Sequence, residues 1–221
     1  MLDDGTRKSH SVAENTEFVS GFFKGIATKD SFAKLVKALY FVYFEMEKAF
    51  EETTDANVKA LDYKELRRSK ALEDDMAYYF GEDWKNVITP SAATEKYIDR
   101  IREVAKETPE LLIAHQYTRY LGDLFGGQMM GGMATRSLEL ENGQGVKFYQ
   151  FDEISSAKDF IEEWYTSLNS LEISPETKQA IVDEGNLVFR LNIDIFSELE
   201  GNAFGSFLRV AWASFKEKYL S

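Results

Sequence analysis

The residues with the clearest potential for chemistry are a carboxylate and a guanidinium set among glycines in residues 111–140, LLIAHQYTRYLGDLFGGQMMGGMATRSLEL. This stretch is predicted to be helical, although each interior glycine costs about 1 kcal/mol relative to alanine, so we expect a bend. At ~100° per residue, Gly122 and Gly126 lie on one stripe, with Arg119 and Asp123 in the same arc. A missing side chain lets another object approach the backbone. The stripe therefore predicts a groove for a flat ligand, with Asp123 beside it.

A second glycine stripe, Gly127 and Gly131, is turned away from the first. Small residues four apart are also typical of close helix–helix packing, and spacing alone leaves that structural role open for both stripes. A membrane-spanning helix is excluded for this stretch, because Arg119, Asp123 and Arg136 interrupt it.

The sequence contains two histidines, and either could ligate a metal. His10 has Glu14 one helical turn later, where a carboxylate could orient the imidazole through a hydrogen bond. His115 lies on the glycine-rich stretch, and on a helical wheel it could face the same groove as Gly122. Spacing does not choose between the two histidines.

Two motifs give the chain a family resemblance. Residues 114–128, AHQYTRYLGDLFGGQ, resemble the distal-helix motif of the biliverdin-forming haem oxygenases of cyanobacteria, algae and animals. Residues 5–15, GTRKSHSVAEN, resemble the proximal helix of the same family, and the segments KALYFVY and FRLNIDIFSELE are similar to it as well. The similarity covers nearly the whole chain, and its two main motifs are specific.

The resemblance implies a role for each matching residue. His10 aligns with the proximal iron ligand, and Glu14 with the carboxylate that orients its ring. Gly122 and Gly126 match the backbone that lies against the distal haem face, and Asp123 matches the residue that holds a distal water and routes a proton. The other matches belong to the water network, the propionate edge and the apolar walls: Tyr43, Arg119 and Asn192; Tyr117; and Phe189 and Phe196.

The sequence also departs from the family pattern. Asp3, Ile161 and Tyr165 stand where better-known members carry basic residues for the haem propionates, so only Arg7 remains of that set. Phe125 replaces a serine of the distal motif. The orientation of haem, and hence the meso carbon that is oxidised, is therefore left open.

The resemblance implies an enzyme, a haem oxygenase for which haem b is both substrate and cofactor. With O2 and reducing electrons it would form biliverdin, CO and Fe2+, and so feed bilin or phycobilin synthesis. The alternative is a haem-binding carrier or sensor with reduced or no turnover, suggested by the missing propionate cations; Asp123 argues against it. A third possibility is a metal-free helical enzyme or interaction protein on a related fold.

Composition limits the class of protein. A length of 221 residues with 44% hydrophobic residues predicts a single domain over residues 1–221. A net charge of −12 disfavours binding to nucleic acid or to an anionic membrane. The absence of cysteine excludes disulfides, iron–sulfur clusters and a thiolate haem ligand. We expect no signal peptide, and a location in the cytoplasm or the plastid stroma.

A soluble acidic enzyme suggests a soluble electron donor such as ferredoxin. Ferredoxins are themselves acidic, so the docking face should concentrate positive charge. The densest basic cluster is Lys64, Arg67, Arg68 and Lys70, of which the first three would share one face of a helix. We expect this cluster to be the ferredoxin contact; a merely solvated basic patch is the alternative.

The hydrophobic periodicity predicts an all-α fold, and the resemblance implies that haem is sandwiched between proximal and distal helices. Each proline follows a hydroxyl residue, a pattern typical of helix starts, so Pro90, Pro109 and Pro175 should each open a helix. Residues 146–151 are strand-like but too isolated to form a sheet. Further helices are expected over residues 4–24, 30–52, 66–80, 156–170, 174–200 and 203–219. Asp30 or Ser31 should cap the second of these, Gly81 should end the third, and Ser156 should cap the fourth.

Overall fold

The structure, a computed structural model, describes residues 28–141 and 143–199, and every regular element in these ranges is helical. The all-α prediction is confirmed, and 146–151 forms a short 3-10 helix rather than a strand. The helices predicted over 4–24 and 203–219 lie outside the described residues. The α-helices are α3 (Lys29–Glu52), α4 (Ala56–Ala60), α5 (Ser69–Phe80), α6 (Ala92–Glu107), α7 (Leu112–Gln116), α8 (Gly122–Ser137), α9 (Ala157–Asn169) and α10 (Pro175–Leu199). The shorter elements are η1 (Lys64–Leu66), η2 (Trp84–Asn86), η3 (Pro109–Leu111), the π-helical η4 (Tyr117–Leu121) and η5 (Lys147–Tyr149).

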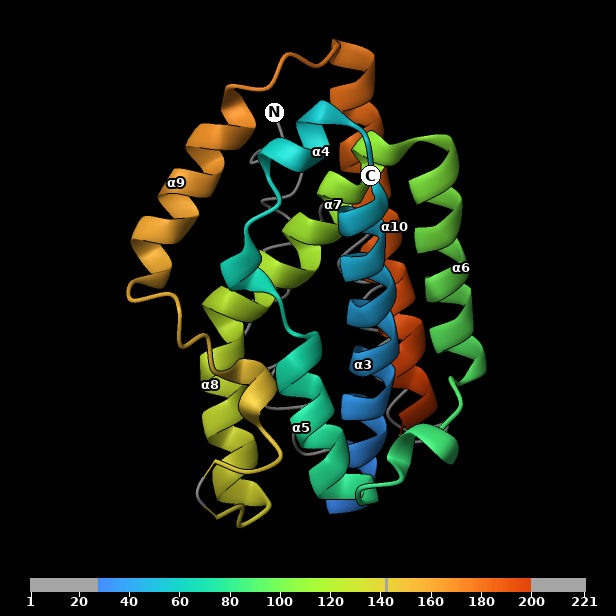
Figure 1. The fold of residues 1–221 in the computed structure, drawn as a ribbon, viewed down its shortest axis with the longest axis vertical. Coiled ribbons are helices and arrows are strands. Elements are labelled where there is room, and N and C mark those ends of the chain that lie inside the picture. Colours follow the sequence, from blue (N-terminus) through green and yellow to red (C-terminus); the bar gives the residue numbers. More distant parts are fainter. Residues whose placement is uncertain (1–27, 142, 200–221) are drawn as a thin grey trace, which may run out of the picture.

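Helix α3 is the central element of the fold (Figure 1). It packs against α5, α6 and α10, and α10 in turn packs against α6 and α7. The chain α7–η4–α8 crosses from this layer to the left of the view, where α8 contacts η5 and α9. The distal-motif residues therefore lie on a segment that is supported from several sides.

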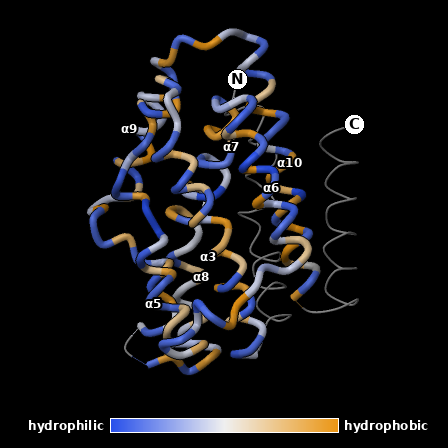
Figure 2. The backbone as a smooth tube through the Cα atoms, turned by 45° about the vertical axis from the view of Figure 1, so that its right-hand side comes forward, coloured by the Kyte–Doolittle hydropathy of each residue, from blue (hydrophilic) through white to orange (hydrophobic). Residues whose placement is uncertain are grey.

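Helix α3 is long because its apolar residues recur at helical spacing. Phe32, Leu35, Val36, Leu39 and Val42 are all buried along one side. Figure 2 shows hydrophobic and hydrophilic residues interleaved along the labelled helices, as expected for helices with one buried face. Within the described ranges, we find no helix with the length and apolarity needed to cross a membrane.

The helix starts test the capping predictions. The N-cap of α3 is Thr28, whose hydroxyl accepts from Ser31 N at 3.1 Å, so the predicted cap at Asp30 or Ser31 is wrong. Ser156 caps α9 as predicted, accepting from Asp159 N at 3.3 Å. Helix α5 ends at Gly81 as predicted, with φ +80°, a conformation that glycine adopts without strain.

Two of the three prolines open helices. Pro109 begins η3 and Pro175 begins α10. Pro90 does not, because Ser91 caps α6 with its hydroxyl and the helix starts at Ala92. The start predicted for α5 at residue 66 is also wrong, since Leu66 belongs to η1 and residues 67–68 separate it from α5.

Candidate functional site

The segment that carries the distal motif is not one regular helix. A π-helical turn, η4, separates α7 from α8, whereas the glycines themselves lie in α-helix. Single π-turns inside helices are frequent at functional sites, and a wheel of ~3.6 residues per turn does not hold across one. The irregularity predicted for this segment therefore exists, but it lies before the glycines rather than among them.

A buried polar group forms around Asp123. The Tyr43 hydroxyl of α3 donates to Asp123 Oδ2, and Arg119 Nη2 of η4 donates to the same oxygen at 2.8 Å. Arg119 Nη1 donates to Asn192 Oδ1 of α10, also at 2.8 Å. All four side chains are buried. Four residues that the resemblance singled out are thus brought together from separate elements.

The electrostatics of this group favour proton exchange at Asp123. Burial raises the pKa of the Asp123 carboxyl, although Arg119 and the Tyr43 hydroxyl stabilise its charged form. Burial, and then the neighbouring Asp123 carboxylate, raise the pKa of Tyr43 well above its ordinary value, so the phenol remains a donor. Among the described residues, the hydrogen bonds to Asp123 all go to Oδ2. Oδ1 is left to accept from or donate to another group.

The two glycine stripes have different surroundings. A Cβ added at Gly122 or Gly126 would meet no described atom within 4 Å, as a groove requires. A Cβ at Gly127 would come within 2.9 Å of Tyr149 Cδ1, and one at Gly131 within 2.8 Å of Tyr149 Cβ. The groove interpretation therefore applies to the first stripe and close packing to the second.

His115 is engaged in a different interaction. It is fully buried, and its Nε2 lies 3.0 Å from Glu184 Oε1 of α10. Burial lowers the pKa of His115, so the ring is neutral at pH 7. Burial alone would raise the pKa of Glu184, but hydrogen bonds from His115 and Arg100 bring it down to about 2. The other histidine, His10, lies outside the described residues, as do Glu14 and Arg7.

The remaining predicted residues lie at the edge of the site or away from it. Tyr117 is buried against Trp164, with its hydroxyl 3.4 Å from that of Tyr165. Phe189 and Phe196 are half-buried on α10. The propionate role of Tyr117 and the wall roles of the two phenylalanines stay predictions.

Sequence reasoning missed several residues of this region. Tyr97 is fully buried and lies 5.6 Å, between ring centroids, from His115. Glu184, Asp75 and Tyr149 were missed because each contacts partners that are far away in the chain, which periodicity does not detect. The second glycine stripe was the one available signal, since its spacing left close packing open as a structural role.

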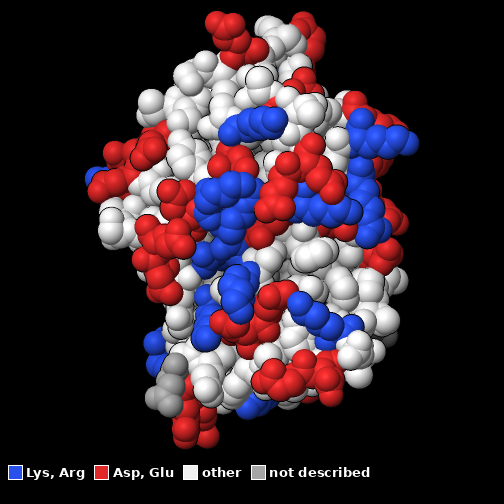
Figure 3. All heavy atoms as spheres, viewed as in Figure 1, with Lys and Arg blue, Asp and Glu red and all other residues white. Residues whose placement is uncertain are grey.

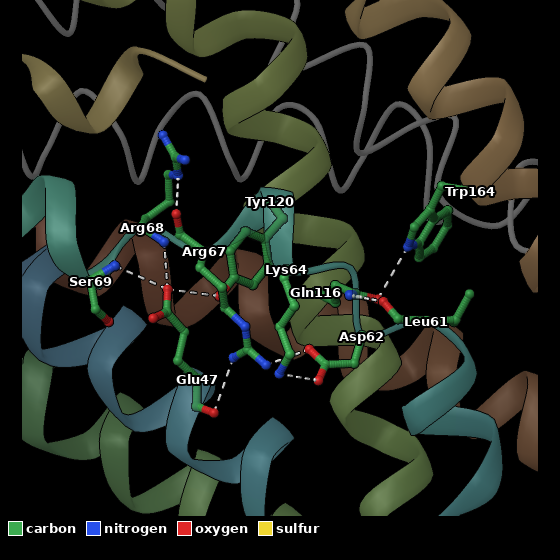
Figure 4. Close-up of polar contacts among 10 residues, drawn as sticks. All are labelled: Glu47, Leu61, Asp62, Lys64, Arg67, Arg68, Ser69, Gln116, Tyr120 and Trp164. Carbon is green, nitrogen blue, oxygen red and sulfur yellow. Dashed lines mark hydrogen bonds and ion pairs between the residues drawn. The ribbon is translucent and has the colours of Figure 1, made fainter. Parts of the chain in front are cut away.

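Two residues of the basic cluster predicted to contact ferredoxin, Arg67 and Arg68, make internal contacts. Arg67 pairs with Asp62 and donates to the Glu47 carbonyl (Figure 4). Arg68 is only 7% exposed. Residues 64–70 do not form one helix, because η1 ends at Leu66 and α5 begins at Ser69, so the prediction that Lys64, Arg67 and Arg68 share one face of a helix is wrong. The ferredoxin contact itself stays a prediction.

No group of three or more histidine, cysteine or acidic residues within 28–141 and 143–199 could hold a metal ion. The described part of the chain thus contains the buried polar group around Asp123 and the helix that carries Gly122 and Gly126.

The chain is similar to known proteins over most of its length. The heme oxygenase family model matches residues 1–198. Heme oxygenase 1 of Nostoc sp. is 45% identical over 199 residues, which cover 90% of this chain and 84% of that protein. The heme oxygenase of Guillardia theta is 42% identical over 211 residues, covering 95% and 89%. The crystal structure of heme oxygenase-1 from Synechocystis sp. in complex with heme has a TM-score of 0.83 at 41% identity, covering 100% of this chain and 97% of that one.

Proposed function

The chain belongs to the haem oxygenase family, and from this premise we propose how its residues divide the reaction among themselves. It is an enzyme that opens haem to biliverdin. The residue assignment rests on the surroundings of Asp123. Tyr43 and Arg119 hold its carboxyl in a buried polar group, and no described atom lies within 4 Å of a Cβ built at Gly122 or Gly126. We propose that residues 1–221 form one domain.

The distal side fits haem. Among the described residues, no atom lies within 4 Å of a Cβ built at Gly122 or Gly126, which fits a flat macrocycle lying directly against this backbone. When bound, haem supplies both the iron at which O2 is activated with the help of reducing electrons and the ring that is opened. A side chain at either glycine would occupy the space of the macrocycle or of O2, so these two residues confine the reaction sterically.

Asp123 holds and moves the proton in this proposal. Its raised pKa means that it keeps a proton at a higher pH than an exposed carboxyl does. Arg119 and Tyr43 fix Oδ2, which leaves Oδ1 to contact a water on the distal side. A carboxyl positioned in this way can pass a proton through that water toward the reacting centre. Asn192 orients Arg119, so its role is indirect.

His10 is the proposed axial ligand, with Glu14 orienting its ring and Arg7 pairing with a propionate. Support comes from the second histidine: the Nε2 of His115 is already bonded to Glu184 in the interior. The His115 ring is also fully buried, so of the two histidines in the sequence we propose His10 as the ligand of iron. Tyr117, Phe189 and Phe196 are assigned to the edge and walls of the haem pocket.

A soluble ferredoxin is the proposed electron donor, and the product is proposed to enter bilin synthesis in a cytoplasm or a plastid stroma. Relatives from a cyanobacterium and an alga support this setting. The internal hydrogen bonds of Arg67 and Arg68 favour a ferredoxin contact elsewhere on the surface.

The histidine assignment is tested by titrating haem into the wild type, His10→Ala and His115→Ala while recording the Soret band, and then measuring turnover. Wild type should bind haem 1:1 and form biliverdin with ferredoxin or ascorbate. His10→Ala should bind haem weakly and lose turnover, with partial recovery on adding imidazole. His115→Ala should keep the axial spectrum of the wild type.

Two results would contradict the proposal. Loss of the axial spectrum in His115→Ala would reverse the histidine assignment. Stoichiometric haem binding by the wild type without biliverdin formation, with either donor, would favour the carrier or sensor. The isomer of biliverdin, resolved by chromatography, reports which meso carbon is oxidised in a chain with Asp3, Ile161 and Tyr165 at the usual basic positions.

A further inference from the structure

The three-residue helix η5 touches the proposed site from two sides. The ring of Phe148 packs edge-on against that of Tyr43, with centroids 5.1 Å apart, and Tyr43 donates to Asp123. The next residue, Tyr149, lies against α8. One short segment thus contacts both a hydrogen-bond partner of Asp123 and the helix that carries Asp123.

The Tyr149 side chain occupies the space left by the second glycine stripe. Its Cβ lies 2.8 Å from the position a Cβ would take at Gly131, and its Cδ1 lies 2.9 Å from the corresponding position at Gly127. Real Cβ atoms are essentially never this close to another atom, so no side chain fits at either glycine without a shift. The ring therefore sets how closely α8 approaches η5.

The ring also extends toward the acid group. Its base is at Gly131 and its Cδ1 and Cε1 edge is at Gly127, whose Cβ position is 3.6 Å from Asp123 Cβ. Tyr149 is 5% exposed, and burial followed by the Asp123 carboxylate raises the pKa of its hydroxyl. Tyr149 and Asp123 thus lie on either side of the Gly127 Cβ position, close enough for the carboxylate to affect the tyrosine hydroxyl.

Helix η5 is itself held rigidly. Asp75 of α5 accepts hydrogen bonds from Lys147 N at 2.9 Å and from Phe148 N at 2.8 Å. Arg68 donates to the carbonyls of Phe148 and Gln150, and its own backbone N–H donates to Glu47 of α3 (Figure 4). The segment is anchored to α5 and, through Arg68, to α3, which also carries Tyr43.

We infer that Tyr149 is a positioning residue of the haem oxygenase site: held by η5, its ring seats α8 at Gly127 and Gly131 and thereby fixes where Asp123 lies relative to haem. The part concerning haem rests on the proposed function, whereas the seating of α8 does not. Tyr149 is not assigned contact with substrate.

The seating is tested without haem by measuring the Tm of glycine variants in two backgrounds. Gly127→Ala places a methyl against the ring, so it should lower Tm when residue 149 is tyrosine and raise it or leave it unchanged in the Tyr149→Ala background. Gly131→Ala is the matched control: its methyl meets the Cβ of residue 149, which alanine retains, so it should lower Tm in both backgrounds. Gly132→Ala, which meets only the flexible tip of Arg136 at 3.5 Å, should be tolerated in both.

The effect on Asp123 is tested in the haem complex by a readout other than turnover, the pH midpoint between the acid and alkaline spectra of the ferric form. Tyr149→Ala and Gly127→Ala should shift this midpoint by about half a unit or more, because the polar group beside the distal water moves. Tyr149→Phe keeps the ring and should retain the wild-type midpoint, as should Gly132→Ala.

Each part of the inference can fail separately. Equal destabilisation by Gly127→Ala in both backgrounds would overturn the seating. A coupling in Tm with an unchanged midpoint in Tyr149→Ala would reduce Tyr149 to packing and overturn its positioning role. Failure of the wild type to bind haem would overturn the proposed function, and with it the link from Tyr149 to haem, while the Tm comparison would still stand.

Discussion

At the scale of single residues, two buried carboxyls have pKa values shifted in opposite directions because their surroundings differ. Glu184 is held ionised by Arg100, through bonds of 2.9 and 2.6 Å, and by His115. Its pKa of about 2 leaves it no proton to give near neutral pH. Asp123 has one arginine and one phenol, both on Oδ2, and burial raises its pKa. Carboxyls whose environments push their pKa values apart take different roles, which supports the proposal that Asp123 is the proton carrier.

Replacing the Asp123 carboxyl by an amide of the same shape should therefore separate binding from chemistry. Asp123→Asn should bind haem with nearly wild-type affinity, but biliverdin formation should fall by about 10²–10⁴-fold, the usual contribution of a positioned acid. The measurement is single-turnover biliverdin yield with ascorbate as donor. Asp183→Asn, an exposed carboxyl on α10 bonded to Gln179, is the control for charge. A wild-type yield from Asp123→Asn would remove Asp123 from proton delivery.

At the scale of elements, the helices follow from periodicity and capping. The buried spacing of α3, the Ser156 cap of α9 and the Gly81 end of α5 are local signals, and the sequence is enough to predict them. The π-turn at η4 is not local, since it depends on how α7 and α8 are held by other elements. A helical wheel that does not include this π-turn places His115 and Gly122 on the same face.

The site residues likewise divide into those that a local stretch of sequence predicts and those that depend on tertiary contacts. Asp123 and Gly122 could be proposed from the stretch that contains both. The role of Gly127 could not, because the residue that fills its space, Tyr149, comes from a segment with a strand-like pattern that forms a 3-10 helix. Asp75, which holds that segment, gives no sequence signal at all, since an isolated helical aspartate is ordinarily exposed.

The anchoring of η5 should appear in the pH dependence of stability. Burial raises the pKa of Asp75 from 3.8 to about 6, so the folded protein binds this proton more tightly than the unfolded chain does. The contribution of Asp75 to stability therefore falls as pH rises from about 4 to about 6, by about 3 kcal/mol in all. Asp75→Asn cannot ionise, so its free energy of unfolding relative to wild type should rise by about that amount over this window in urea titrations.

Asp74→Asn, at the neighbouring position, is a control for which the change of stability with pH should have the opposite sign. Hydrogen bonds from Lys70 and Lys147 lower the pKa of Asp74, so this variant should lose stability relative to wild type as pH rises, and only slightly, because the side chain is 35% exposed. Parallel curves for Asp75→Asn and wild type between pH 4 and 7 would show that Asp75 does not titrate as a buried acid.

At the scale of the whole molecule, charge is distributed rather than gathered. The net charge of −12 arises from 26 basic and 38 acidic residues, and Figure 3 shows basic and acidic side chains interspersed over the visible face. Lys64 and Lys70 are 65% and 82% exposed, yet each lies within 2.9 Å of a carboxylate, Asp62 and Asp74 respectively. Local density of basic residues in the sequence therefore does not predict a positive surface, because the fold pairs the cations with nearby acids.

Reversing the charge of the two arginines in this cluster should therefore lower the stability of the fold rather than specifically weaken the interaction with the electron donor. Replacing both arginines, Arg67→Glu with Arg68→Glu, puts carboxylates where Arg68 is 7% exposed and bonded to the carbonyls of Phe148 and Gln150. Removing one partner of a buried charged group costs about 3–5 kcal/mol, so Tm should fall and turnover should fall equally with ferredoxin and with ascorbate. Lys64→Glu with Lys70→Glu changes exposed side chains whose ion pairs contribute little to stability, so this variant should keep the wild-type Tm. If the double arginine variant instead kept its Tm and lost only ferredoxin turnover, with the loss reversed by salt that screens charges beyond ~10 Å at 0.1 M, the arginines would be a docking surface after all.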